Sequence, residues 1–174
     1  FMKIVVVGLG YVGLSNAVLL AQNNDVIGVD ISEERVNDLN TRKSPIIDEK
    51  LSQYLEEKEL NLSASTNLIC AVVGANYVIV STPTNYDENT NIFDTSSVKS
   101  VIGQVIENEP NACIVIKSTV PVGFTDNVSK QFNTDAVIFS PTLNDPMTFV
   151  RFTFVPLVPS ANTNPVAPLV TPLT

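Results

Sequence analysis

The sequence contains no histidine. Histidine is the most frequent general base and a common zinc ligand, so its absence excludes Ser-His-Asp and Cys-His catalysis and histidine-ligated zinc. The only two cysteines, Cys70 and Cys113, are too few for a disulfide framework or a four-cysteine metal site. Both stand among apolar or small residues, and we expect them to be buried packing residues with inert thiols.

Basic residues are also scarce. Lys and Arg number 10 against 18 Asp and Glu, which gives a formal net charge of −8. Because contacts with phosphates need Lys and Arg, this balance argues against a DNA or RNA partner. No apolar run reaches the roughly 18 residues of a membrane-spanning helix, and the first run, 4–7, is too short for a signal peptide. We therefore expect a cytoplasmic protein that binds neither membranes nor nucleic acids.

Short runs of β-branched residues alternate with segments of helical composition before residue 141. The continuous apolar run at 4–7 is typical of a strand buried on both faces of a parallel sheet. Six alternating strands predict an α/β fold of the Rossmann type, with a doubly wound parallel sheet and helices on both faces. The predicted strands are 4–7, 26–30, 62–65, 77–80, 112–116 and 136–139, and the predicted helices are 12–22, a segment starting at Ser32, 48–59, 67–73, 96–107 and 125–132.

The composition changes near residue 141. The segment from Asp145 to the end holds six of the eleven prolines, only two charged residues and no glycine. Proline at these intervals excludes a helix and any central strand. The sequence therefore predicts a folded domain over 2–141 and an extended or disordered Pro-rich tail over 142–174, to which we assign no function. An out-of-frame or wrongly assigned end is the alternative.

A glycine fingerprint, Gly-Leu-Gly-Tyr-Val-Gly at 8–13, directly follows the first strand and opens the first helix. Gly8 permits the tight turn, Gly10 lets the backbone approach a pyrophosphate, and Gly13 allows the helix to pack against the strand. The helix N-terminus offers N–H groups and the positive end of its dipole to an anion. An ordinary glycine turn is the alternative, but the strand-turn-helix context favours dinucleotide binding. We expect Tyr11 to pack near the cofactor.

An acidic residue stands at the end of the second strand. Asp30 follows Gly10 by 20 residues, where a carboxylate can accept hydrogen bonds from an adenosine ribose. The same carboxylate repels a 2′-phosphate, so the sequence predicts NAD rather than NADP. Arg35 is the residue that argues the other way, because a guanidinium can hold a phosphate.

Two hydroxyl-bearing loops follow later strands, at the edge where open α/β sheets bind their ligands. The first, at 81–84, contains Thr82, and the second, at 117–123, contains Thr119. Their hydroxyls can hydrogen-bond a cofactor and their prolines stiffen the loops. Plain turn chemistry of Ser, Thr and Pro is the alternative.

In this order, the segments GLGYVGLSNAVLLAQ, VDIS, KSPIIDE, STPTNYD, TSSV, IKSTVPVGFT and IFSP resemble the UDP-glucose/GDP-mannose 6-dehydrogenase family. The resemblance covers residues 2 to about 141 and is strongest to the short bacterial UDP-glucose 6-dehydrogenases. It implies an N-terminal Rossmann domain that binds NAD. Family members oxidise the sugar C6 alcohol to a carboxylate with two NAD molecules and a cysteine-bound thiohemiacetal. The positions matching the family's NAD contacts are Val12, Asp30, Arg35, Thr82 and Thr119.

The sequence departs from the family where the chemistry begins. Thr142 stands where the family has an active-site glutamate, and neither Cys70 nor Cys113 matches the nucleophilic cysteine. The UDP-sugar domain and the helix of the family's homodimer have no counterpart in the sequence. We therefore expect the NAD-binding domain of a UDP-glucose 6-dehydrogenase without its catalytic half, with UDP-glucose as a partner only in the complete enzyme.

Two other functions fit a Rossmann domain. A non-catalytic NAD(H)-sensing module also binds the dinucleotide, but it has no need of the loops at 81–84 and 117–123, which a dehydrogenase uses to position the nicotinamide. A hydroxyacid dehydrogenase is the second alternative, but the sequence shows no catalytic Lys or His for it.

Overall fold

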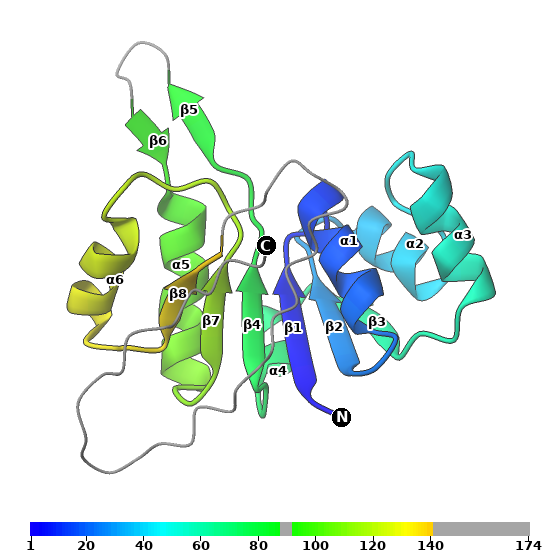
Figure 1. Ribbon diagram of the computed structural model, residues 1–174, viewed down its shortest axis with the longest axis horizontal. Coiled ribbons are helices and arrows are strands. Elements are labelled where there is room, and N and C mark those ends of the chain that lie inside the picture. Colours follow the sequence, from blue (N-terminus) through cyan, green and yellow to red (C-terminus); the bar gives the residue numbers. More distant parts are fainter. Residues whose placement is uncertain (88–91, 141–174) are drawn as a thin grey trace, which may run out of the picture. The chain divides into compact units, whose positions relative to one another are not determined.

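The computed structural model describes residues 1–87 and 92–140. Its main sheet has six strands in the order β3-β2-β1-β4-β7-β8 (Figure 1), and every neighbouring pair is parallel. The chain starts at the centre, runs outward to β3, and then returns to build the other half from β4. This is the doubly wound order, with its switch point between β1 and β4. The strands are β1 (Lys3–Val7), β2 (Asp25–Val29), β3 (Leu62–Ser65), β4 (Tyr77–Val80), β7 (Cys113–Ile116) and β8 (Val137–Phe139).

The predicted Rossmann architecture is confirmed. Strand bounds differ from the expected ones by at most one residue and helix bounds by at most two. The side chain of Ser32 caps its helix as expected, accepting from the Arg35 N–H at 3.4 Å. The helices are α1 (Tyr11–Leu20), α2 (Glu33–Asn40), α3 (Glu49–Glu57), α4 (Leu68–Val72), α5 (Ser96–Asn108) and α6 (Phe124–Phe132).

Sequence reasoning missed a short hairpin. Strands β5 (Asn85–Asp87) and β6 (Ile92–Asp94) form a separate antiparallel pair. This pair lies in the connection between β4 and α5, at the carboxyl edge of the main sheet (Figure 1). Each strand has three residues, too few for a hydrophobic period to be recognised.

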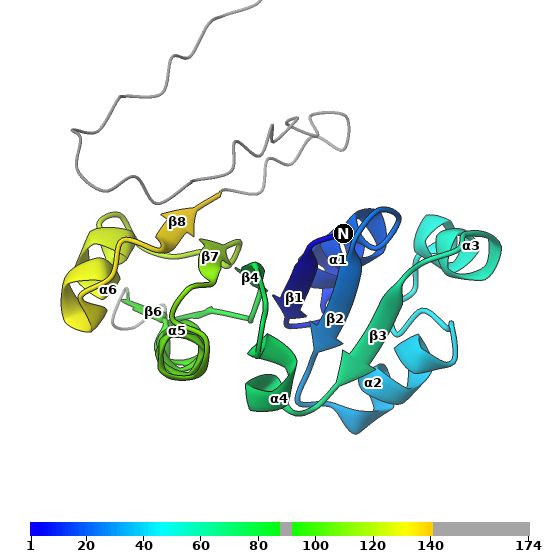
Figure 2. The ribbon, with the colours of Figure 1, turned by 90° about the horizontal axis from the view of Figure 1, so that it is seen from below.

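Side chains alternate along each strand, so the central strands contribute to a core on either face of the sheet. Val5 and Val7 belong to a core that α4, α5 and α6 cover, whereas Ile4 and Val6 belong to a second core that α1 and α3 cover. Figure 2 shows α1 and α3 on one side of the sheet and α4 and α5 on the other. The prediction of helices on both faces therefore holds.

The expectation that both cysteines are buried is wrong. Cys70 is exposed, since α4 is short and turns Ala71 and Val72 toward the sheet instead. Cys113 is half-buried at the start of β7, where burial raises the pKa of its thiol. Over residues 1–87 and 92–140, no group of three or more His, Cys, Asp or Glu side chains is placed to hold a metal ion.

Two other expectations concern membranes and the tail. Within the described part of the chain, none of the helices combines the length and the apolar character needed to traverse a bilayer. The predicted tail, 142–174, lies outside the described residues.

Candidate dinucleotide-binding site

Two glycines of the fingerprint are required by the protein's own packing. Gly8 has φ 93°, in the left-handed region that favours glycine. A Cβ there would lie 2.7 Å from the carbonyl oxygen of Ser81, and a Cβ on Gly13 would lie 1.7 Å from the carbonyl oxygen of Gly8. The turn from β1 into α1 and its approach to the loop after β4 therefore depend on both residues.

Gly10 differs from these two glycines. Its φ of −76° is open to any residue, and beyond its sequence neighbours no atom of the described residues lies within 4 Å of a Cβ placed on it. Gly10 is also the N-cap of α1 and supplies no side-chain cap. The helix therefore begins beside open space, with the N–H groups of its first turn, including those of Tyr11 and Val12, at the end that favours anions.

Asp30 is fixed beside this turn. Asp30 follows β2 directly, and its side chain is only 5% exposed. One oxygen accepts from the Leu9 N–H at 2.7 Å and lies 3.3 Å from Nη1 of Arg35. The other accepts from the Ser32 N–H at 3.0 Å. The structure thus brings Asp30 and Arg35 together, and it shows a contact to Leu9 that the sequence did not predict.

The two hydroxyl-bearing loops meet at the neighbouring strands. Oγ of Ser118, in the loop after β7, donates to the carbonyl oxygen of Thr82 at 2.7 Å. Oγ of Ser97, in the first turn of α5, donates to the Pro83 carbonyl at 3.0 Å and lies 3.3 Å from Oγ1 of Thr82. Thr119 is exposed, next to Ser118. Both predicted threonines therefore lie at the carboxyl edge of the sheet, at the top of Figure 1.

One buried hydroxyl has no partner. Among the described residues, Oγ of Ser81 is buried without a hydrogen bond. Ser81 faces the fingerprint, since its Cβ lies 3.3 Å from a Cβ placed on Gly13. An unsatisfied buried hydroxyl costs about 1–3 kcal/mol, which contact with a bound molecule would offset. Sequence reasoning selected Thr82 from this loop and passed over Ser81. Ser81 could have been recognised as a small polar residue that directly follows a strand.

Tyr11 makes a contact that the sequence did not predict. Its side chain is 59% exposed, and its hydroxyl donates to Oδ2 of Asp48 at 2.9 Å. Oδ1 of Asp48 accepts from the Leu51 N–H at 2.9 Å and so caps α3. The bond from the Leu51 N–H, and after it the bond from the Tyr11 hydroxyl, lowers the pKa of Asp48. The bond to Asp48 raises the pKa of Tyr11. The fingerprint is thereby tied to the connection between α2 and α3.

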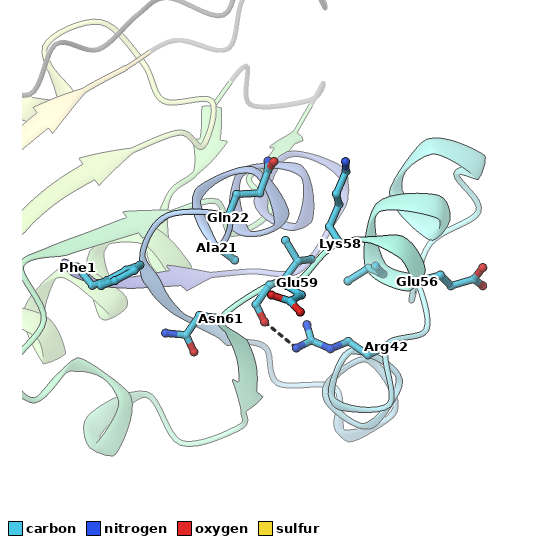
Figure 3. A pocket seen from close by; sticks show the side chains of 10 residues that line it. Phe1, Ala21, Gln22, Arg42, Glu56, Lys58, Glu59 and Asn61 are labelled. Carbon is cyan, nitrogen blue, oxygen red and sulfur yellow. Dashed lines mark hydrogen bonds between the residues drawn. The ribbon is translucent and has the colours of Figure 1, made fainter.

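A cavity of about 610 Å³ lies at the opposite edge of the sheet, between the ends of α1 and α3 and the residues entering β3 (Figure 3). Nη2 of Arg42 donates to the Leu60 carbonyl at 2.7 Å on its wall. The charges of its lining are mixed, with Arg42 and Lys58 beside Glu56 and Glu59, and they define no class of ligand. The carboxyl edge therefore carries the candidate site.

The glycine turn after the central strand, the fixed carboxylate of the next strand and the hydroxyl-bearing loops across the switch point define a dinucleotide-binding domain of the Rossmann class. Residues 2–140 match the family model described as "UDP-glucose/GDP-mannose dehydrogenase family, NAD binding domain". The chain belongs to this family, and the matched domain is the one that binds NAD.

Curated relatives agree with this assignment. The chain is 51% identical over 140 residues to a UDP-glucose 6-dehydrogenase of Streptococcus pneumoniae, and 39% identical over 142 residues to one of Campylobacter jejuni. Each alignment covers 80% of this chain and 36% of the relative. The chain therefore matches about a third of the length of these relatives.

A solved structure shows the same fold. A GDP-mannose dehydrogenase from Pseudomonas aeruginosa superposes with a TM-score of 0.70 at 25% identity. That superposition covers 82% of this chain and 36% of the other. The expected family, fold and cofactor are thus confirmed, while the roles of the individual site residues stay predictions.

Proposed function

We propose that residues 2–141 form the NAD-binding domain of a UDP-glucose 6-dehydrogenase. In this proposal the pyrophosphate lies at Gly10, the adenosine ribose at Asp30, and the nicotinamide half between the loops of Thr82 and Thr119. The observation that carries it is the open space at Gly10, beside a carboxylate that the protein holds in place. Nothing in the packing of residues 1–87 and 92–140 explains a glycine there.

The first turn of α1 provides the anion site. Backbone N–H groups at the start of a helix lack partners within the helix, and the dipole adds positive potential at the same place. Tyr11, Val12 and Gly13 occupy these positions. With no side chain on Gly10, a pyrophosphate can approach these N–H groups directly.

Asp30 determines the preference for NAD over NADP. A carboxylate has about four acceptor positions, and Leu9, Ser32 and Arg35 use three of them. The remaining position can accept from a ribose hydroxyl. A 2′-phosphate would bring a second negative charge against the buried carboxylate, which favours NAD. Arg35 is paired with Asp30 through Nη1, so its guanidinium is directed at the carboxylate.

The substrate is assigned through the relatives, which are UDP-glucose 6-dehydrogenases. Oxidation of a sugar alcohol through a thiohemiacetal needs a cysteine beside the nicotinamide. Cys113 begins β7 at the amino edge of the sheet, and Cys70 is on α4, which precedes β4. Neither thiol lies at the carboxyl edge, so we propose that the 174-residue chain binds NAD without oxidising UDP-glucose. A cytoplasmic location stays a prediction.

The test combines binding with turnover. Calorimetric titration of the 174-residue chain should show NAD binding that is tighter than NADP binding. Incubation with NAD and UDP-glucose should give no steady increase in NADH absorbance. Absence of NAD binding would refute the cofactor site, and steady NADH production would refute the assignment of the cysteines. The variant Thr41→Ala, at the C-cap of α2, serves as a binding control.

A further inference from the structure

Ser118 lies in the loop after β7 and is bonded to the loop after β4. Its side chain is buried, with 6% of the residue exposed. Its hydroxyl donates to the Thr82 carbonyl at 2.7 Å, and its own N–H donates to the Val80 carbonyl at 3.1 Å. These partners precede Ser118 by 36 and 38 residues in the chain. One side chain thus couples the ends of β4 and β7.

The loop of Thr82 is also held from the opposite side. Ser97 of α5 donates to the Pro83 carbonyl at 3.0 Å, and its hydroxyl lies 3.3 Å from that of Thr82. The carbonyl of Thr82 therefore accepts from the Ser118 hydroxyl, and the next carbonyl along the chain, that of Pro83, accepts from the Ser97 hydroxyl. Such a network fixes the direction in which the Thr82 side chain and the adjacent backbone face the edge of the sheet.

The position of these loops identifies the half of the dinucleotide that they serve. A dinucleotide crosses a doubly wound sheet at its switch point, with one nucleotide over each half. Asp30, at the end of β2, marks the adenosine side. Thr82 and Thr119, after β4 and β7, therefore face the other nucleotide.

We propose that Ser118 is a positioning residue for the nicotinamide half of NAD. It acts through Thr82, whose carbonyl it holds, and through Thr119, which follows it in the chain. This inference rests on the proposed placement of NAD and adds a residue that the family resemblance did not supply. A hydroxyl with a purely structural role would affect both halves of the site alike.

The experiment compares NAD with ADP, which has the adenosine and both phosphates but lacks the nicotinamide and its ribose. Ser118→Ala removes one hydrogen bond, so we expect NAD affinity to fall about fivefold while ADP affinity stays unchanged. Ser118→Thr keeps the hydroxyl and should restore the ratio of NAD to ADP affinity, whatever its added methyl group does to Tm. Both affinities are measured by calorimetry on the 174-residue chain.

Thr41→Ala is the matched control. Its hydroxyl also donates to backbone carbonyls, those of Asn37 at 3.0 Å and Asp38 at 2.9 Å, but it lies at the C-terminal end of α2. It should change neither affinity. Unchanged NAD affinity in Ser118→Ala, or an equal loss for NAD and ADP, would overturn the positioning role. If the unmutated chain bound neither ligand, the proposed function itself would be refuted, and binding of ADP without NAD would refute the placement of the nicotinamide half.

Discussion

Replacement of Asp30 tests the cofactor site most directly, because one carboxylate supports both the protein and the proposed ribose contact. Asp30→Ala removes the acceptor of the Leu9 N–H, a bond of 2.7 Å in a buried place. A buried donor left without a partner costs about 1–3 kcal/mol. At roughly 2–4 °C per kcal/mol for a protein of this size, Tm should fall by about 2–12 °C.

Asp30→Asn separates the charge from the hydrogen bond. The amide oxygen can still accept from Leu9, so Tm should fall less than in Asp30→Ala. The negative charge is lost in both variants, and Arg35, whose side chain is 44% exposed, is released from its ion pair at 3.3 Å. Like charges forced together at a binding site cost several kcal/mol, so the preference for NAD over NADP should shrink by about tenfold or more.

The assay is calorimetric titration of the unmutated chain and both variants with NAD and with NADP. Loss of discrimination in Asp30→Asn, at nearly unchanged Tm, would assign the selectivity to charge. Equal affinity of the unmutated chain for the two cofactors would refute the reasoning. So would full retention of the NAD preference in Asp30→Asn.

Two further predictions concern the fingerprint. Gly10→Val should lower NAD affinity about tenfold or more with Tm nearly unchanged, whereas Gly13→Ala should lower Tm, because its Cβ would lie 1.7 Å from the Gly8 oxygen. Normal NAD binding by Gly10→Val in a titration would show that the loop is only a turn. Tyr11→Phe should lower the urea midpoint at pH 7. The pKa of Asp48 is lowered from 3.8, so this difference should be present above that pH and disappear as pH falls through the lowered pKa. A difference that persists in strong acid would contradict the carboxylate's role.

The strands and the glycine turn could be predicted because their signals are local. A run such as Ile4-Val5-Val6-Val7 is typical of a parallel strand that helices cover on both faces, and the fingerprint is contiguous. The exposure of Cys70, in contrast, is not determined by its neighbours in the sequence. It depends on which residues of a five-residue helix meet the sheet, and a rotation of one position exchanges Cys70 with Ala71.

The hydrogen bonds that organise the site could not be predicted for a related reason. Leu9 meets Asp30 across 21 residues, Tyr11 meets Asp48 across 37, and Ser118 meets Thr82 across 36. No regular spacing connects such partners. The bonds of Leu9 and Ser118 exist because parallel strands end at one edge of the sheet, and that of Tyr11 because the start of α1 lies beside the N-cap of α3. Sequence reasoning selected Asp30 and Thr82 by their residue type and position. It could not select Ser81, Ser118 or Asp48, whose importance comes from their neighbours in space.

The unequal surroundings of the three fingerprint glycines have a consequence for gene duplicates. Suppose a copy of this domain stops binding nucleotides but keeps folding. Gly8 and Gly13 must then persist, because side chains there would collide with the backbone, whereas position 10 is free to accept larger residues. In such a lineage Gly8 and Gly13 are kept as long as the fold is kept, whereas glycine at position 10 is kept only as long as the ligand is bound.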